Sequence, residues 1–154
     1  MTILGLDYRS NRWRGVAHAL ARVGDVLARV DVAVGNREEC EMAVGVSDPE
    51  KAADALLERG VKLAIVKQGP KGTLAKTADE RVWVEARQVD VINGLGAGDA
   101  FGGALIHGLV EGWDLETPIR YASAAGAYVC ACIECSTAMP PPAPLSTFVE
   151  PGAP

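Results

Sequence analysis

The most informative stretch of this sequence is Asn93-Gly94-Leu95-Gly96-Ala97-Gly98-Asp99-Ala100-Phe101-Gly102-Gly103-Ala104. The glycines at positions 94, 96 and 98 let the backbone turn sharply and come close to a ligand. A helix that begins near Asp99 directs its unpaired N–H groups and the positive end of its dipole toward the same point. The stretch therefore predicts an anion site of the kind that binds phosphate.

The carboxylate of Asp99 is the unusual member of this site, because its charge opposes anion binding unless it has a proton to accept. A general base for a hydroxyl nucleophile fits that position. The alternative is that Asp99 simply caps its helix. A dinucleotide fingerprint is excluded, since Asp99 stands where a third glycine is required, and the chain contains no Gly-Lys-Ser or Gly-Lys-Thr of a Walker loop.

Around this stretch, short apolar runs alternate with amphipathic segments. Strands are predicted at 3–6, 32–34 and 61–66, and a hairpin at 74–76 and 82–84. Helices are predicted at 13–30, 37–44, 49–59 and 99–113, and a last helix is capped at Thr117-Pro118 and directs Ile133 inward. This alternation indicates an α/β fold with a mainly parallel sheet.

The composition limits the classes of function. A chain of 154 residues, of which 49% are hydrophobic and 23% charged, is long enough for one domain with a real core. Its formal charge of −5 comes without the basic stripe that binding to duplex nucleic acid requires. No apolar run approaches the roughly 20 residues of a membrane span, and no signal peptide is visible, so we expect a cytoplasmic protein. The four cysteines are expected to be reduced thiols, and Cys40 could be exposed.

Gly96-Ala97-Gly98-Asp99, followed by Phe101 and Gly103-Ala104, resembles the C-terminal signature of the ribokinase-like, or PfkB, carbohydrate kinases. In that family the signature aspartate is the catalytic base, and the preceding glycine-rich amides form the anion hole for the transferring phosphate. The resemblance gives these roles to Asp99 and to Gly96, Ala97 and Gly98. It also implies a ribokinase-like three-layer sandwich, with ATP and Mg²⁺ as cofactors.

Other segments resemble further elements of the family. Asn36 and Glu39 match an Asn-x-x-Glu element that follows a strand, which implies that they organise the magnesium and phosphates through water. The run from Val66 to Gly72 resembles the strand and turn near the nucleotide. The resemblance implies that the nucleotide contacts come from Lys67, Gly69, Gly72 and Ser123, where Ser123 replaces the usual asparagine near the adenine. Arg9 is a candidate substrate contact.

Within the family, the sequence most resembles the 5-dehydro-2-deoxygluconokinases of inositol breakdown, which implies 5-dehydro-2-deoxy-D-gluconate as the substrate. Asn93-Gly94-Leu95 replaces the usual Asp-Thr-Thr, so the resemblance does not decide whether this chain has the monovalent-cation site that is built on that aspartate. The resemblance covers the C-terminal half of such a kinase, with residues 1–139 as the nucleotide-binding part and 140–154 as a proline-rich extended tail.

Two functions follow from this resemblance. The first is an ATP-dependent kinase of a sugar or sugar acid, and the alternative is a truncated, inactive nucleotide-binding fragment or interaction module. Because a strand edge near Ile3 would be unpaired, we expect self-association or pairing with the missing N-terminal half. A merely structural fragment is the third possibility.

Overall fold

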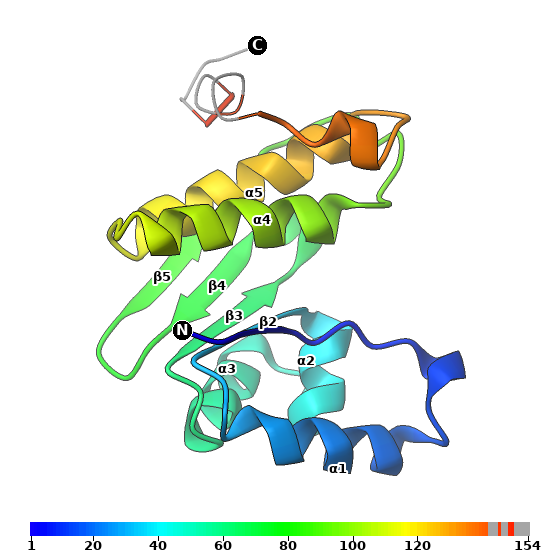
Figure 1. The fold of residues 1–154 in the computed structure, drawn as a ribbon, viewed down its shortest axis with the longest axis vertical. Helices are drawn as coiled ribbons and strands as arrows, with labels where there is room; N and C mark the ends of the chain where they lie inside the picture. The colour runs from blue at the N-terminus through cyan, green and yellow to red at the C-terminus, as the bar shows by residue number, and fades with distance from the viewer. Residues whose placement is uncertain (142–144, 146–147, 150–154) are drawn as a thin grey trace. The chain divides into compact units, whose positions relative to one another are not determined.

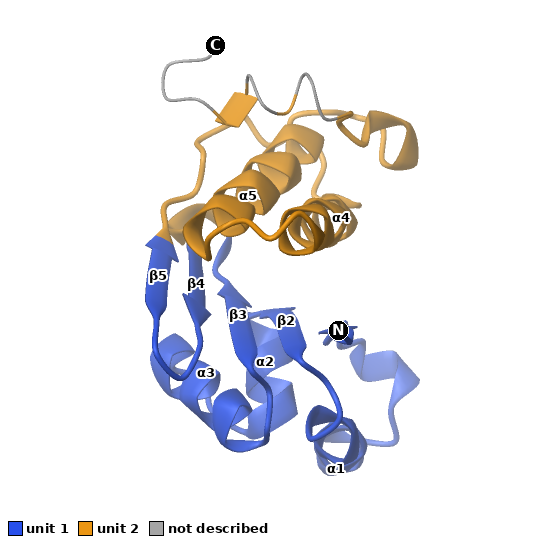
Figure 2. Ribbon diagram, turned by 60° about the vertical axis from the view of Figure 1, so that its left-hand side comes forward, with its two compact units in different colours: residues 1–69, 73–83 blue, residues 70–72, 84–154 orange. Residues whose placement is uncertain are grey.

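The computed structural model describes residues 1–141, 145, 148 and 149, so most of the predicted tail at 140–154 lies outside the described residues. The chain divides into two compact units, coloured separately in Figure 2. Unit 1 comprises residues 1–69 and 73–83, and unit 2 comprises residues 70–72 and 84–154. Among the described residues, no helix combines the length and the apolarity that crossing a bilayer requires.

Unit 1 contains a five-stranded sheet whose strands stand in sequence order (Figure 1). The strands are β1 (Ile3–Gly5), β2 (Val32–Asn36), β3 (Leu63–Lys67), β4 (Thr73–Lys76) and β5 (Arg81–Val84). The first three strands are parallel, and β4 runs antiparallel to β3. The predicted α/β class with a mainly parallel sheet is therefore confirmed, as is the hairpin.

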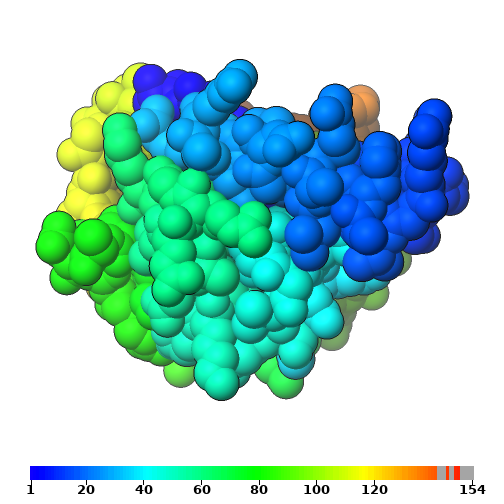
Figure 3. Space-filling model, turned by 90° about the horizontal axis from the view of Figure 1, so that it is seen from below, coloured from blue at the N-terminus to red at the C-terminus, as the bar shows by residue number. Residues whose placement is uncertain are grey.

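Three helices of unit 1 form one face of that unit, which runs from blue to green in the space-filling view (Figure 3). They are α1 (Val16–Leu27), α2 (Arg37–Val44) and α3 (Pro49–Glu58). Their buried side chains meet alternate residues of the strands in one apolar cluster, which includes Leu27, Leu56, Ala64, Val66 and Leu74. Ala64 and Val66 are separated by one position on β3, as expected for one face of a sheet.

Helix α1 begins at Val16, three residues later than predicted. Gly15, which has a φ of +144°, precedes the helix in a conformation that residues with a side chain rarely adopt. Val16 is 61% exposed and so does not belong to the predicted apolar face. Helix α2 has the predicted bounds, and Asp48 caps α3 as predicted by accepting a hydrogen bond from the Lys51 amide (3.0 Å).

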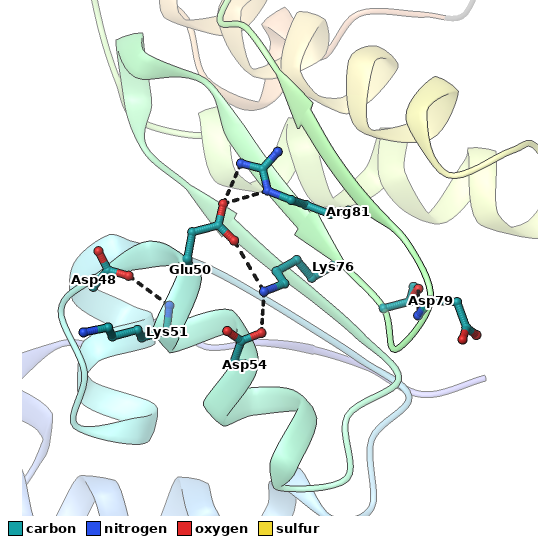
Figure 4. A network of polar contacts seen from close by, with 8 residues as sticks. Asp48, Glu50, Lys51, Asp54, Lys76, Asp79 and Arg81 are labelled. Carbon is teal, nitrogen blue, oxygen red and sulfur yellow. Dashed lines mark hydrogen bonds and ion pairs between the residues drawn. The ribbon is translucent and has the colours of Figure 1, made fainter.

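A polar network fastens α3 to the β4–β5 hairpin (Figure 4). Arg81 donates to Glu50 Oε1 from Nε (2.8 Å) and from Nη2 (2.5 Å). Lys76 pairs with Glu50 (3.4 Å) and also with Asp54. The hydrogen bond from Lys76 to Asp54 is the main reason why the pKa of Lys76 is raised. Because one lysine serves two carboxylates, the network holds the hairpin more firmly than isolated surface pairs do.

Unit 2 is built on two packed helices, α4 (Ala97–Val110) and α5 (Glu116–Cys130). Glycines lie where the two helices approach most closely. A Cβ atom on Gly108 would lie 2.6 Å from the Cβ of Pro118, and one on Gly126 would lie 3.2 Å from the carbonyl oxygen of Ala97. Phe101, Leu105 and Ile119 fill the remaining contact and are nearly inaccessible to solvent.

Two predictions for the last helix are wrong. The N-cap is Leu115 and not Thr117, and the residue before it, Asp114, accepts at Oδ1 from the amides of Glu116 (3.0 Å) and Thr117 (3.1 Å). Hydrogen bonds from Thr117 lower the pKa of the Asp114 carboxyl. The helix ends at Cys130, so the helical spacing no longer applies to Ile133, which is 74% exposed.

Two glycines on α4 give opposite predictions for stability. Gly108→Ala should lower the free energy of unfolding by about 1–3 kcal/mol, because its methyl group overlaps Pro118. Gly102→Ala is the matched control, since a Cβ there meets no atom within 4 Å, and it should raise stability by about 0.5–1 kcal/mol. Urea unfolding measures both. A Gly108→Ala variant as stable as Gly102→Ala would contradict the packing described here.

The free edge of β1 predicts self-association. Among the described residues, β1 pairs only with β2, and its Ile3 and Leu4 are partly exposed. Ile3→Lys should reduce the average mass measured by light scattering, because a charge on an edge strand disfavours pairing. Val91→Lys is the control, since Val91 is 70% exposed and lies outside the sheet. A wild-type chain that is monomeric at all concentrations would refute this prediction.

Candidate functional site

The first turn of α4 presents the residues of the predicted anion hole. Gly96 is the N-cap and has a φ of +86°, in the left-handed region that favours glycine. A Cβ at this position would lie 2.6 Å from the Sγ of Cys135, so both conformation and space require glycine. Ala100 donates to the Gly96 carbonyl (2.9 Å), which makes this the first full helical hydrogen bond.

The amides that precede Ala100 are those that an α-helix leaves without helical acceptors. They belong to Gly96, Ala97, Gly98 and Asp99. Within the part of the chain that the structure describes, Ala97 makes a long contact, 3.4 Å, with the Gly94 carbonyl. Gly94, Gly98 and Asp99 are exposed, whereas Gly96 is buried and Ala97 half-buried, so an incoming group would reach this turn from the side of Gly98 and Asp99. This arrangement suits an anion.

Asp99 is an exposed residue in the third position of α4. The N-cap position belongs to Gly96, and α4 has no side-chain capping hydrogen bond. The alternative that Asp99 caps its helix is therefore not supported by the hydrogen bonding. The carboxylate shares the first turn with the open amides.

A cavity of about 380 Å³ lies within unit 2 beside Asp99. One face of α4 lines it with Asp99, Gly103 and His107, spaced four residues apart, and α5 contributes Tyr121 and Ala125. The rest of the lining comes from Ala100, Ala104, Met139, Pro140 and Leu145. Among the described residues the lining is largely apolar, and its one carboxylate is that of Asp99.

His107 and Tyr121 were not among the predicted site residues. His107 packs edge-on against Trp113 (5.3 Å between centroids), and Trp113 packs in the same way against Tyr121 (5.3 Å). Burial raises the pKa of the Tyr121 hydroxyl. The four-residue spacing of Asp99, Gly103 and His107 could have predicted that His107 lies on the same face of α4 as Asp99. The position of Tyr121 depends on how α5 packs against α4 and could not be predicted from spacing.

Asn36 and Glu39 form a capping box at the point where β2 leads into α2. Asn36 Oδ1 accepts from the Glu39 amide (2.8 Å), and Glu39 Oε2 accepts from the Asn36 amide (2.5 Å). Asn36 also faces Lys67 in the parallel register of β2 and β3. These three predicted residues therefore gather at the carboxyl edge of neighbouring strands, where ligands bind in open α/β sheets.

The capping box leaves the charge of Glu39 at this edge, and Glu39 Oε1 can accept a hydrogen bond from water. Mg²⁺ usually keeps several of its waters and binds near a carboxylate and phosphates. Among the described residues, no group of three His, Cys, Asp or Glu side chains could chelate a metal directly. The residues present fit a magnesium ion that is held through water.

The remaining predicted residues are divided between the units. Arg9 follows β1 in unit 1, is exposed, and pairs with Asp7 (3.4 Å). Gly69, with a φ of +56°, belongs to unit 1, and Gly72, with a φ of +112°, to unit 2. Ser123 is half-buried on α5 of unit 2. Unit 1 thus holds Arg9 and Gly69, and unit 2 holds Gly72 and Ser123.

Residues 5–142 match the pfkB family of carbohydrate kinases, and the chain belongs to this family. Curated relatives include the 5-dehydro-2-deoxygluconokinases of Photobacterium profundum and Clostridium perfringens. The first is 33% identical over 156 residues and the second 29% over 155 residues. Each alignment covers 97% of this chain, and it covers 47% and 46% of the relative, respectively. The chain thus spans about half the length of the curated relatives it matches.

Solved kinases share the fold. An E. coli protein described as a ribokinase II, in complex with ATP and Mg²⁺, has a TM-score of 0.85 and 29% identity, over 94% of this chain and 47% of its own. Aminoimidazole riboside kinase from Salmonella enterica, with its riboside and an ATP analog, has a TM-score of 0.85 and 28% identity, over 97% and 52%. The predicted ribokinase-like fold is confirmed.

The expectation that Cys40 could be exposed is wrong. Cys40 is fully buried in the unit 1 core, and burial, aided by the charge of Glu39, raises the pKa of its thiol from 9.0 to about 12. A raised pKa means that the folded state favours the neutral thiol. Its contribution to stability is present below about pH 9 and is lost as the pH rises toward about 12.

Iodoacetamide at pH 8 should therefore leave Cys40 unmodified in the native chain. The reagent attacks the thiolate, which at Cys40 is both scarce and inaccessible. Cys135, which is half-buried, is the internal control and should react. Peptide mass spectrometry identifies the labelled thiols, and in urea all four should react. Rapid native labelling of Cys40 would contradict its burial.

Proposed function

We propose that this chain supplies the nucleotide-binding and phosphoryl-transfer part of an ATP- and Mg²⁺-dependent kinase. The acceptor is a hydroxyl of 5-dehydro-2-deoxy-D-gluconate. The observation that carries the proposal is that the exposed Asp99 carboxylate shares the first turn of α4 with the Gly96–Gly98 amides, which have no helical acceptors and of which Gly98 is exposed. The pfkB match and the relatives named 5-dehydro-2-deoxygluconokinase support the choice of substrate.

In the proposed reaction, the amides of Gly96, Ala97 and Gly98 donate hydrogen bonds to oxygens of the transferring phosphoryl group. The helix dipole adds a positive potential where negative charge develops. The oxygen of the acceptor hydroxyl bonds to the γ-phosphorus, and Asp99 accepts the proton of that hydroxyl. The bond between the γ-phosphorus and the β,γ-bridging oxygen breaks, and ADP leaves with the electron pair.

The residues at the strand edge of unit 1 have supporting roles. Asn36 and Glu39 hold and orient the waters of a bound Mg²⁺, and Lys67 contributes positive charge for the phosphates. Bound Mg²⁺ neutralises charge on the phosphate oxygens. The nucleotide is contacted by Gly69, Gly72 and Ser123. Arg9 pairs with the carboxylate of the sugar acid, since a guanidinium group can bind a carboxylate through two parallel hydrogen bonds.

A nucleotide-binding module without catalysis is the competing function. It is favoured by the fact that the chain spans about half the length of its curated relatives. A coupled assay for ADP release separates the two functions. It is run with the sugar acid, ATP and Mg²⁺, first on this chain alone and then with the polypeptide that completes the length of the relatives.

Asp99→Asn should lower turnover at least 100-fold in the completed enzyme, the order expected for loss of a general base. The affinity for nucleotide should stay nearly unchanged, because the backbone amides remain. Glu111→Gln is the matched control, since it makes the same chemical change on an exposed residue at the other end of α4. Steady-state kinetics measure both variants. Asp99→Asn with wild-type turnover would remove Asp99 as the base.

Glu39→Gln separates the structural role of Glu39 from its role toward metal. A glutamine oxygen can still accept from the Asn36 amide, so the free energy of unfolding should change by less than about 0.5 kcal/mol. The Mg²⁺ concentration for half-maximal nucleotide binding should rise about tenfold, because the charge is lost. Glu38→Gln, an exposed neighbour in the same helical turn, is the control. An unchanged Mg²⁺ requirement in Glu39→Gln would exclude the metal role.

A further inference from the structure

The loop that leads into α4 is attached to the end of α5. The amides of Ile92 and Asn93 both donate to the Cys130 carbonyl, at 2.8 and 3.1 Å. Cys130 is the last residue of α5, where carbonyl groups lack helical partners. The loop thus provides hydrogen-bond donors for a carbonyl at a helix terminus, 37 positions from Asn93 in the sequence. The path of the loop depends on that terminus.

The side chain of Asn93 extends this attachment in two directions. Its Nδ2 donates to the Ile133 carbonyl (3.0 Å), and its Oδ1 accepts from the Leu95 amide (3.0 Å). The second bond closes a turn of the kind that asparagine forms with the backbone two residues ahead. Each end of the amide group meets a backbone group of complementary polarity, so one half-buried side chain ties the loop both to itself and to the segment after α5.

The turn that Asn93 closes leads directly into the left-handed N-cap Gly96. Gly96 itself packs against Cys135, Met139 and Val129. The amides of Gly96, Ala97 and Gly98 follow within a few residues, so their directions depend on how this turn is held. Preorganised donors are effective because they need no rearrangement when charge develops.

We propose that Asn93 is a positioning residue that fixes the Gly96–Gly98 amides by joining the Leu95 amide to the Ile133 carbonyl. Both of these side-chain hydrogen bonds are made with backbone groups, so its effect is exerted through the loop. Its effect on phosphate rests on the proposed function, whereas its effect on the loop does not. Therefore the two parts are measured separately.

The first measurement is amide hydrogen exchange in the ligand-free chain, followed by NMR. Asn93→Ala removes both side-chain bonds, so the Leu95 amide should exchange at least tenfold faster, with smaller increases at Gly96–Gly98. Asn93→Asp keeps an acceptor for Leu95 but places an oxygen against the Ile133 carbonyl, so Leu95 should stay protected. A general loss of stability would instead speed exchange throughout α4 and α5 in both variants.

The second measurement is the affinity for ATP with Mg²⁺, by calorimetry. Asn93→Ala should weaken binding about tenfold, the order expected for losing side-chain hydrogen bonds that hold the binding loop. Asn93→Asp should weaken it at least as much, because its charge lies near the anion site and opposes phosphate. Gln88→Ala is the matched control, since Gln88 also donates from a side-chain amide to a backbone carbonyl (3.3 Å), in an exposed part of unit 2.

The outcomes are distinguishable. Unchanged Leu95 exchange in Asn93→Ala, or faster exchange with unchanged nucleotide affinity, overturns the positioning role. A wild-type chain that binds no nucleotide overturns the proposed function, and the exchange data then decide the role of Asn93 in the loop by themselves. The inference is supported if Asn93→Ala shows faster exchange at Leu95 together with weaker nucleotide binding. Gln88→Ala should then behave like the wild type in both measurements.

Discussion

The left-handed turn at Gly96 is the constraint on which unit 2 depends. The backbone reverses there with a φ of +86° and passes so close to Cys135 that no side chain fits. This turn lets α4 begin at Ala97 with open amides, and it places Asp99 in the same first turn. The direction of the first-turn amides and the position of the Asp99 carboxylate beside them therefore depend on this turn.

The capping box of Asn36 and Glu39 has two effects in unit 1. The reciprocal bonds between Asn36 and Glu39 begin α2, and they also hold a carboxylate at the end of a parallel strand. Gly35 allows this geometry, because a Cβ there would lie 2.8 Å from Leu6 and 3.1 Å from the Cβ of Glu39. Local helix stability and the placement of the carboxylate that we propose to orient a metal therefore depend on the same few atoms, and Glu39→Gln can separate the two effects.

Local patterns predicted most of the fold, since the alternation of strands and helices, the Asp48 cap and the glycine-rich start of α4 are all encoded by near neighbours. Features set by distant contacts could not be predicted. Cys40 is buried by the packing of α2 on the sheet, and Asn93 reaches a carbonyl 40 positions away. The cap of α5 was misjudged because Thr117-Pro118 is a strong local signal, whereas Asp114 satisfies the amides from one turn earlier. The site residues remain predictions, although the structure gathers Asn36, Glu39 and Lys67 in unit 1.

The most direct test of the anion site is a titration of the ¹⁵N-labelled chain with ADP and Mg²⁺, followed residue by residue through the amide resonances. The account predicts that the largest shifts fall on Gly96, Ala97 and Gly98, since these amides would donate directly to phosphate oxygens. Amides of α1, which contains none of the predicted site residues, should serve as an unaffected reference. Saturable binding that leaves the Gly96–Gly98 resonances unmoved would contradict the central claim.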